Sequence, residues 1–113
     1  MVVPKIVTVI MGMRHQTKDL EWYMSRLYEL IRELGMTYIN EVVHEFPNGG
    51  LSINMLIAES HIALHTWPEY DFVHVEVSSC VDVAPEYVSN TIMKLFDFED
   101  SDVLYEKRIV TGG

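Results

Sequence analysis

Residues 36–80 consist almost entirely of short strand-favouring stretches, and apolar and polar residues alternate in most of those after residue 50. A period of two is the pattern of a β-strand with one buried face, because successive side chains point to opposite sides of a sheet. The breaks between the stretches are short and rich in turn residues, "PNGG" at 47–50 and "PEYD" at 68–71. Loops this short join antiparallel neighbours. The alternation therefore predicts consecutive strands at 36–46, 51–58, 61–67 and 72–80.

Two stretches outside this region have helical spacing. Apolar residues recur at intervals of three and four before Gly35, which predicts a helix over 17–34 that the glycine ends. A second helix is predicted over 85–96, with Pro85 well placed in its first turn. Each helix has one apolar face, so each must pack against the sheet.

Two further strands complete the expected fold. "KIVTVIM" at 5–11 is rich in β-branched residues and is predicted to stop at Gly12, and "VLYEKRIV" at 103–110 forms the last strand. The order is strand, helix, four strands, helix and strand. It predicts an α+β fold, a two-layer sandwich in which a largely antiparallel sheet carries two helices packed on one face.

The sheet face without helices is expected to collect the polar side chains of the strands. In each strand, alternate residues share that face if the strand is regular. The candidates are Ser52, Asn54, Leu56 and Ala58 in one strand, His61, Ala63, His65 and Trp67 in the next, and His74, Glu76, Ser78 and Cys80 in the third.

Length and charge restrict the function. The 113 residues suffice for a single domain with one core, 1–113. The net charge is −9, and the eight lysines and arginines are scattered along the chain, so a phosphate backbone would be repelled. We therefore expect no nucleic-acid partner, and a small cationic ligand is electrostatically favoured.

Cysteine content and the N-terminal sequence bear on location. Cys80 is the only cysteine, so no disulfide can form within the chain. The apolar run after Lys5 is too short to span a membrane and lacks a signal-peptide cleavage pattern. We expect a cytoplasmic protein without a membrane partner.

Two other kinds of site fit this sequence less well. His61, His65 and His74 could converge on zinc from alternate strand positions, but the chain has no cysteine pair and no HExxH helix, so we expect no metal. A hydrolase nucleophile at Ser60 is less favoured still, because the serine lacks a glycine-flanked elbow.

The stretch "ESHIALHTWPEY" at 59–70, followed by Cys80, resembles the prokaryotic S-adenosylmethionine decarboxylase proenzymes, which are pyruvoyl-dependent. The resemblance extends over residues 42–80 and includes "HEF", "GLS", "HTWPE" and the strand that ends in cysteine. It implies self-cleavage between Glu59 and Ser60, giving a β chain 1–59 and an α chain 60–113 that begins with a pyruvoyl group derived from Ser60.

The resemblance also implies roles for three other residues. Ser52 matches the family residue that stabilises the oxyanion during cleavage, and His65 matches the base that removes the Cα proton of Ser60. Cys80 matches the donor that protonates the substrate carbon, which suits a thiol that keeps its proton at neutral pH. The pyruvoyl group would form a Schiff base with the substrate amine and accept electrons while carbon dioxide leaves.

The implied substrate is S-adenosylmethionine, decarboxylated for polyamine (spermidine) biosynthesis by a homodimer of processed protomers. Glu69 would bind ribose hydroxyls, and Phe46 and Trp67 would contact the adenine or the sulfonium. The chain departs from the family around "EVSSCV" at 76–81 and "GMRHQ" at 12–16, which bears on substrate identity. Two alternatives therefore remain: a divergent decarboxylase of ornithine or arginine, and an unprocessed paralogue without enzymatic activity.

Overall fold

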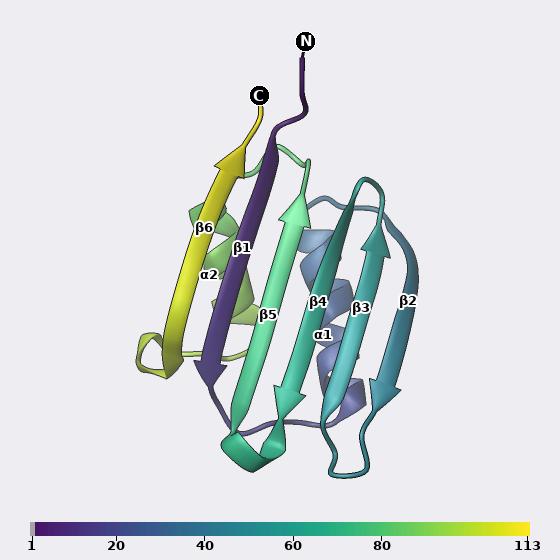
Figure 1. Cartoon of the computed structure of the whole chain (residues 1–113), viewed down its shortest axis with the longest axis vertical. Helices are drawn as coiled ribbons and strands as arrows, with labels where there is room; N and C mark the ends of the chain where they lie inside the picture. Colours follow the sequence, from purple (N-terminus) through teal and green to yellow (C-terminus); the bar gives the residue numbers. More distant parts are fainter. Residues whose placement is uncertain (1) are drawn as a thin grey trace.

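The structure, a computed structural model, describes residues 2–113 as a six-stranded antiparallel sheet with two helices on one face (Figure 1). The strand order is β2-β3-β4-β5-β1-β6, so the chain's first strand lies between its fifth and its last. The predicted α+β sandwich is confirmed. The elements are β1 (Ile6–Arg14), α1 (Leu20–Glu33), β2 (Tyr38–Glu45), β3 (Leu51–Ile57), β4 (Ser60–Trp67), the 3₁₀ turn η1 (Pro68–Tyr70), β5 (Phe72–Ser79), α2 (Pro85–Leu95), the 3₁₀ turn η2 (Asp100–Asp102) and β6 (Val103–Thr111).

One hydrophobic core lies between the sheet and the helices. Alternate residues of the four central strands are buried there, and they meet the apolar faces of α1 and α2. Helix α1 begins later than the predicted residue 17, because the Asp19 side chain accepts a hydrogen bond from the backbone N–H of Trp22 and so caps the helix. Tyr23, Leu27, Phe96, Met11, Met13, Ile53, Met55, Ile62 and Leu64 are among the fully buried residues.

The predicted end of the first strand at Gly12 is wrong. Strand β1 continues through Gly12 to Arg14 and pairs with β5 and β6 along its length. Glycine weakens a strand but does not end one when another group needs its space. Here the ring of Tyr105 occupies that space: a Cβ on Gly12 would lie 2.2 Å from two of its ring carbons.

The other sheet face carries no helix, and we call it the open face. Strand register arranges its side chains in lateral rows. The predicted alternation in β4 and β5 is confirmed, since Val73, Val75 and Val77 are buried on the core side. The row that concerns the site consists of His44, Ser52, His65, His74, Gly12 and Tyr105, paired in that order across the sheet.

Candidate active site

The predicted cleavage bond lies in a tight turn between β3 and β4. Ile57 pairs with Ser60, so only Ala58 and Glu59 connect the two strands. Glu59 has φ 63°, in the left-handed region that side chains with a Cβ rarely adopt. The peptide bond between Glu59 and Ser60 therefore follows a residue with a strained backbone.

Ser60 is held beside Cys80 at this end of the sheet. The backbone N–H of Cys80 donates to the Ser60 hydroxyl oxygen at 3.3 Å. Both residues are half-buried, and Cys80 immediately follows the last residue of β5. The structure thus places the expected cleavage serine next to the expected proton donor.

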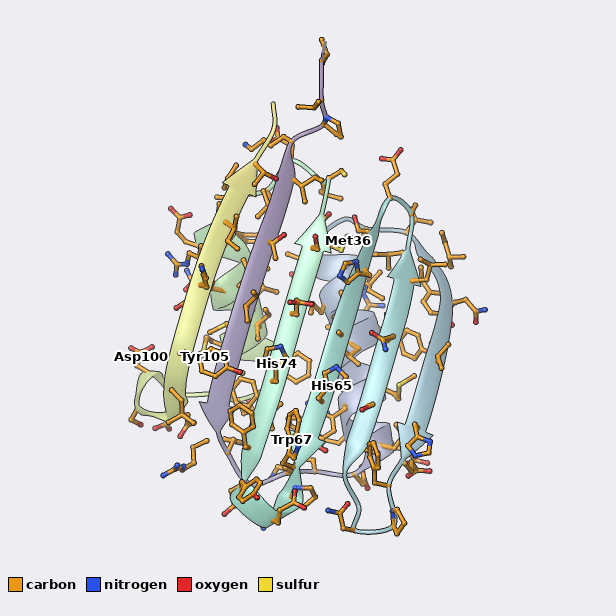
Figure 2. All side chains as sticks on the ribbon, viewed as in Figure 1. Met36, His65, Trp67, His74, Asp100 and Tyr105 are labelled. Atoms are coloured by element: carbon orange, nitrogen blue, oxygen red, sulfur yellow. The ribbon has the colours of Figure 1, made fainter. Side chains whose placement is uncertain are left out.

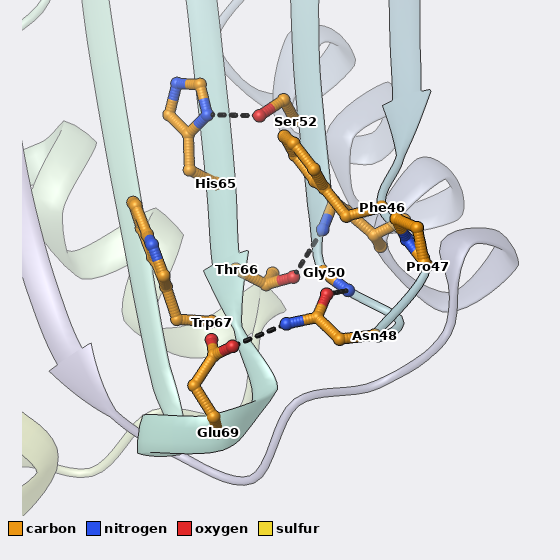
Figure 3. A pocket seen from close by; sticks show the side chains of 10 residues that line it. Phe46, Pro47, Asn48, Gly50, Ser52, His65, Thr66, Trp67 and Glu69 are labelled. Carbon is orange, nitrogen blue, oxygen red and sulfur yellow. Dashed lines mark hydrogen bonds between the residues drawn. The ribbon is translucent and has the colours of Figure 1, made fainter.

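A cavity of about 400 Å³ lies at the opposite end of β4 (Figure 3). This volume is in the range of small-molecule sites. The rings of Phe46 and Trp67 stand on either side of it, with Ser52 and His65 at one end and Asn48 and Glu69 at the other. Five of the predicted site residues line this cavity: Phe46, Ser52, His65, Trp67 and Glu69.

Ser52 and His65 form a hydrogen-bonded pair in the cavity wall. The Ser52 hydroxyl and His65 Nδ1 are 2.9 Å apart, because the two residues face each other across β3 and β4. Burial lowers the pKa of His65, and the neighbouring His74 imidazole lowers it further, while the Glu76 carboxylate acts weakly in the opposite direction. His65 is consequently held as a neutral imidazole, the form that can accept a proton.

The turn at 47–50 supplies cavity residues that the sequence pattern did not identify. "PNGG" was interpreted only as a turn, but the Asn48 amide donates to the Glu69 carboxylate while its oxygen accepts from the N–H of Gly50. Thr66 is a second such residue: its hydroxyl accepts from the N–H of Leu51. Asparagine in a hairpin turn is so common that its contact with a residue 21 positions away had no sequence signal.

The expected site residues do not form one cluster. Ser60 and His65 lie on the same strand five residues apart, which corresponds to roughly 16 Å along β4. The structure therefore brings Ser60 together with Cys80, and Ser52 with His65, Phe46, Trp67 and Glu69, but does not join the two groups within one chain.

The histidines do not converge as a metal site would require. His65 and His74 are direct neighbours across β4 and β5, but His61 pairs with Ser78, four residues further along the strand. Within residues 2–113, no three His, Cys, Asp or Glu side chains are grouped so as to hold a metal ion. In the same range, no helix combines the length and apolarity needed to cross a membrane.

Fold and site together define a class: a small α+β protein that carries a strained Glu-Ser turn, a neighbouring thiol and a serine–imidazole pair on one sheet. A family profile described as "S-adenosylmethionine decarboxylase" matches residues 7–109. The chain belongs to that family, and the resemblance recognised from "ESHIALHTWPEY" is confirmed.

Individual relatives agree with the family assignment. The chain is 36% identical over 92 residues to an S-adenosylmethionine decarboxylase proenzyme of Thermodesulfovibrio yellowstonii, covering 80% of this chain and 68% of that protein. It is 42% identical over 65 residues to the proenzyme of Pseudomonas aeruginosa, covering 58% of this chain and 41% of that protein. The matched region thus spans about two-thirds of the length of the first relative and less than half of the length of the second.

A solved structure shares the fold. The crystal structure of the adenosylmethionine decarboxylase from Aquifex aeolicus superposes with a TM-score of 0.74, covering 99% of this chain and 92% of that chain. The sequence identity is 19%, so this likeness concerns the fold alone.

Proposed function

We propose that this protein cleaves itself between Glu59 and Ser60 and then decarboxylates S-adenosylmethionine, a step that supplies polyamine biosynthesis. The observation that carries the proposal is the geometry of the cleavage bond: Glu59 has φ 63°, and the hydroxyl of Ser60 is fixed by the Cys80 N–H. Strain in the amide lowers the cost of converting it to an ester, which is unfavourable for a relaxed peptide. Family membership supports the substrate.

The proposed cleavage needs only groups of this chain and a water molecule. The Ser60 hydroxyl attacks the carbonyl carbon of Glu59, and the amide becomes an ester. A base then removes the Cα proton of Ser60, and the bond between Cβ and Oγ breaks, which gives residues 1–59 ending in the α-carboxylate of Glu59 and a dehydroalanine at position 60. Water replaces the nitrogen of that residue and releases ammonia, so the second fragment begins with a pyruvoyl group.

One arrangement of protons allows Ser52 and His65 to serve both predicted roles. If His65 donates its Nδ1 hydrogen to the Ser52 oxygen, Nε2 is free to accept the Cα proton. The hydroxyl hydrogen of Ser52 then remains available for the oxyanion that forms at the Glu59 carbonyl. The observed 2.9 Å pair is compatible with this tautomer.

Because Ser60 and His65 are roughly 16 Å apart along β4, a second copy of the chain is required to bring them together. We propose a two-fold homodimer in which the open faces pack and the strands run in opposite directions, so the Ser60 end of one protomer meets the cavity of its partner. The open face supports this packing, since it exposes large apolar side chains. Val42, Leu56, Tyr105 and Trp67 are 70%, 53%, 44% and 39% exposed.

The residues present fit a pyruvoyl group at position 60. When formed, this group supplies an electron sink for decarboxylation. The backbone contact of Cys80 with Ser60 supports a role for the Cys80 thiol as the proton donor to the substrate carbon. In the cavity, Phe46 and Trp67 can hold the adenine between two rings, and Glu69, fixed by Asn48, can accept hydrogen bonds from ribose hydroxyls. These contacts favour an adenosyl substrate over ornithine or arginine.

Cleavage would leave the fold intact, which determines how it is detected. Residues 1–59 contain β1, β2 and β3, and residues 60–113 contain β4, β5 and β6, but β1 lies between β5 and β6. The fragments remain paired through three strand interfaces and separate only under denaturing conditions.

The test is denaturing electrophoresis and intact mass measurement of purified protein, together with carbon dioxide release from S-adenosylmethionine, ornithine and arginine. We expect two fragments, the second lighter by one ammonia than a fragment that begins with serine. Ser60→Ala should abolish cleavage and activity, whereas Cys80→Ala should cleave but turn over poorly. Ser78→Ala, which changes an open-face serine two residues before Cys80, is the matched control. A single uncut chain in the wild type would contradict the proposal and favour the non-enzymatic paralogue.

A further inference from the structure

A second group of polar rings lies beside the cavity on the open face. His65, His74 and Tyr105 follow one another from β4 across β5 to β6 (Figure 2). The ring centroids of His65 and His74 are 6.2 Å apart, and those of His74 and Tyr105 are 6.0 Å apart. His74 and Tyr105 belong to none of the roles assigned above.

Tyr105 and His74 are joined by a short hydrogen bond. The Tyr105 hydroxyl oxygen and His74 Nδ1 are 2.6 Å apart, although β1 lies between their two strands. The tyrosine therefore reaches across a whole strand to make this contact. Burial raises the pKa of Tyr105, so its hydroxyl keeps its proton at neutral pH and can donate to Nδ1.

Gly12 makes this reach possible. It pairs with both His74 and Tyr105, and it lies directly beneath the tyrosine ring. Any Cβ at position 12 would lie 2.2 Å from the ring and 2.7 Å from the hydroxyl oxygen. Glycine in the middle of a strand is destabilising, and close approach of another group is the usual reason for it.

We propose that His74 is a positioning residue for His65, and that Tyr105 fixes the His74 ring in that place by passing over Gly12. The inference rests on the proposed role of His65 as the base in self-cleavage. His74 forms one wall of the space around His65, opposite the Ser52 contact, so the two neighbours restrict the His65 ring from both sides.

His74 also acts on His65 through charge when its imidazole is protonated, the state in which Nδ1 donates to the Tyr105 oxygen instead of accepting from it. An imidazolium beside His65 would oppose a second positive charge, which is one cause of the lowered pKa of His65. The other titratable or charged groups of this face are His61 on β4, Glu76 on β5 with Cys80 beyond its end, His44 on β2, Arg14 on β1, and Tyr105 and Lys107 on β6. Of these, Glu76 acts on the pKa of His65 and raises it.

The test is the titration of the His65 imidazole by nuclear magnetic resonance, in uncut Ser60→Ala protein. We expect His74→Phe to move the titration to higher pH, because the repelling charge is lost. His74→Gln, which can still accept from Tyr105, should move it likewise but preserve the ring environment of His65. Tyr105→Phe and Gly12→Ala break the hydrogen bond while His74 remains, and should broaden or displace the His65 signals. His44→Phe, in the same row beyond Ser52, is the matched control and should change neither the pH of the His65 titration nor the position and width of the His65 signals.

The rate of self-cleavage as a function of pH gives the second readout. In His74→Phe the acid limb of the profile should move to higher pH, while thermal unfolding reports any general loss of stability. A His65 titration that is unchanged in His74→Phe would overturn the inference. If the titration moves but the wild type never cleaves, the positioning of His65 stands and the proposed function fails.

Discussion

The two ends of β4 differ in whether backbone or side-chain groups make up the proposed site. At the Ser60 end, the important features belong to the backbone: a two-residue turn, a left-handed Glu59 and an N–H from Cys80. At the cavity end, they belong to side chains from the 47–50 turn, β3, β4 and η1. The bond proposed to be cleaved is thus a local property of the chain, whereas the groups proposed to act on it depend on strand register.

The largest effect is expected if the Ser60 end of one protomer meets the cavity end of its partner in a dimer. Ser60→Ala and His65→Ala are each expected to block cleavage alone. When the two variants are co-expressed, the mixed dimer has one complete site, formed by Ser60 of one chain and His65 of the other. We therefore expect the His65→Ala chain alone to be cut, as measured by mass spectrometry.

The control for this experiment replaces one partner. Co-expression of His65→Ala with a Ser60→Ala/His65→Ala double variant provides no His65 at all and should give no cleavage. If the mixed dimer also remains uncut, the two ends do not meet across the proposed interface.

A smaller effect is expected at the cavity end. Phe46→Ala removes one of the two rings that flank the cavity, and an aromatic contact with a cation is worth about 0.5–2 kcal/mol. KM for S-adenosylmethionine should rise by roughly twofold to thirtyfold, with little change in self-cleavage. Tyr70→Ala removes an exposed aromatic ring that does not line the cavity and should leave KM unchanged. An equal rise of KM in both variants would show that Phe46 has no specific role in substrate binding.

At the cleavage end, relief of backbone strain should slow the reaction. Glu59→Gly adopts φ 63° without the penalty of a Cβ, which is about 1 kcal/mol. The precursor should become more stable and cleave several-fold more slowly, as followed by electrophoresis over time. Asp97→Gly, at φ 57° after α2, tests the same backbone relief far from Ser60. Faster cleavage in Glu59→Gly would show that this strain does not drive the rearrangement.

The smallest effect concerns pH and stability. The folded protein holds the pKa of His65 below the ordinary value of 6.5, so the unfolded chain takes up a proton first as the pH falls. The contribution of His65 to stability is therefore present above that pH and decreases below it. Urea unfolding of Ser60→Ala protein at neutral and mildly acidic pH should show a smaller acid loss when His65→Gln is added. An identical loss would mean that His65 does not contribute.

The sequence predicted the strands best where alternation was strict. In β3, β4 and β5, the period of two fixed which residues face the core, and the structure agrees. Gly12 was misinterpreted as a strand end because its reason for being glycine, the Tyr105 ring, lies more than 90 residues away in the chain. The contact of Asn48 with Glu69 escaped for the same reason.

The residues of the candidate site were predicted individually, but their separation into two groups at opposite ends of β4 was not. "ESHIALHTWPEY" carries the resemblance to the family, which is confirmed, and it suggests the cleavage bond, because a motif of neighbouring residues can be read without the fold. Which residues gather at each end of β4 was not predictable, because Cys80 reaches Ser60, and Ser52 reaches His65, only through the pairing of neighbouring strands.

The sequence alone therefore determined the fold class and the core faces of the strands, and it supplies the proposed scissile bond, because periodicity and a local motif are short-range properties. Only the tertiary structure decided which side chains meet: the pairing of Ser52 with His65, of Cys80 with Ser60, and of His74 with Tyr105 over Gly12. These contacts depend on strand order and register, and both are set by the packing of the whole sheet against its helices.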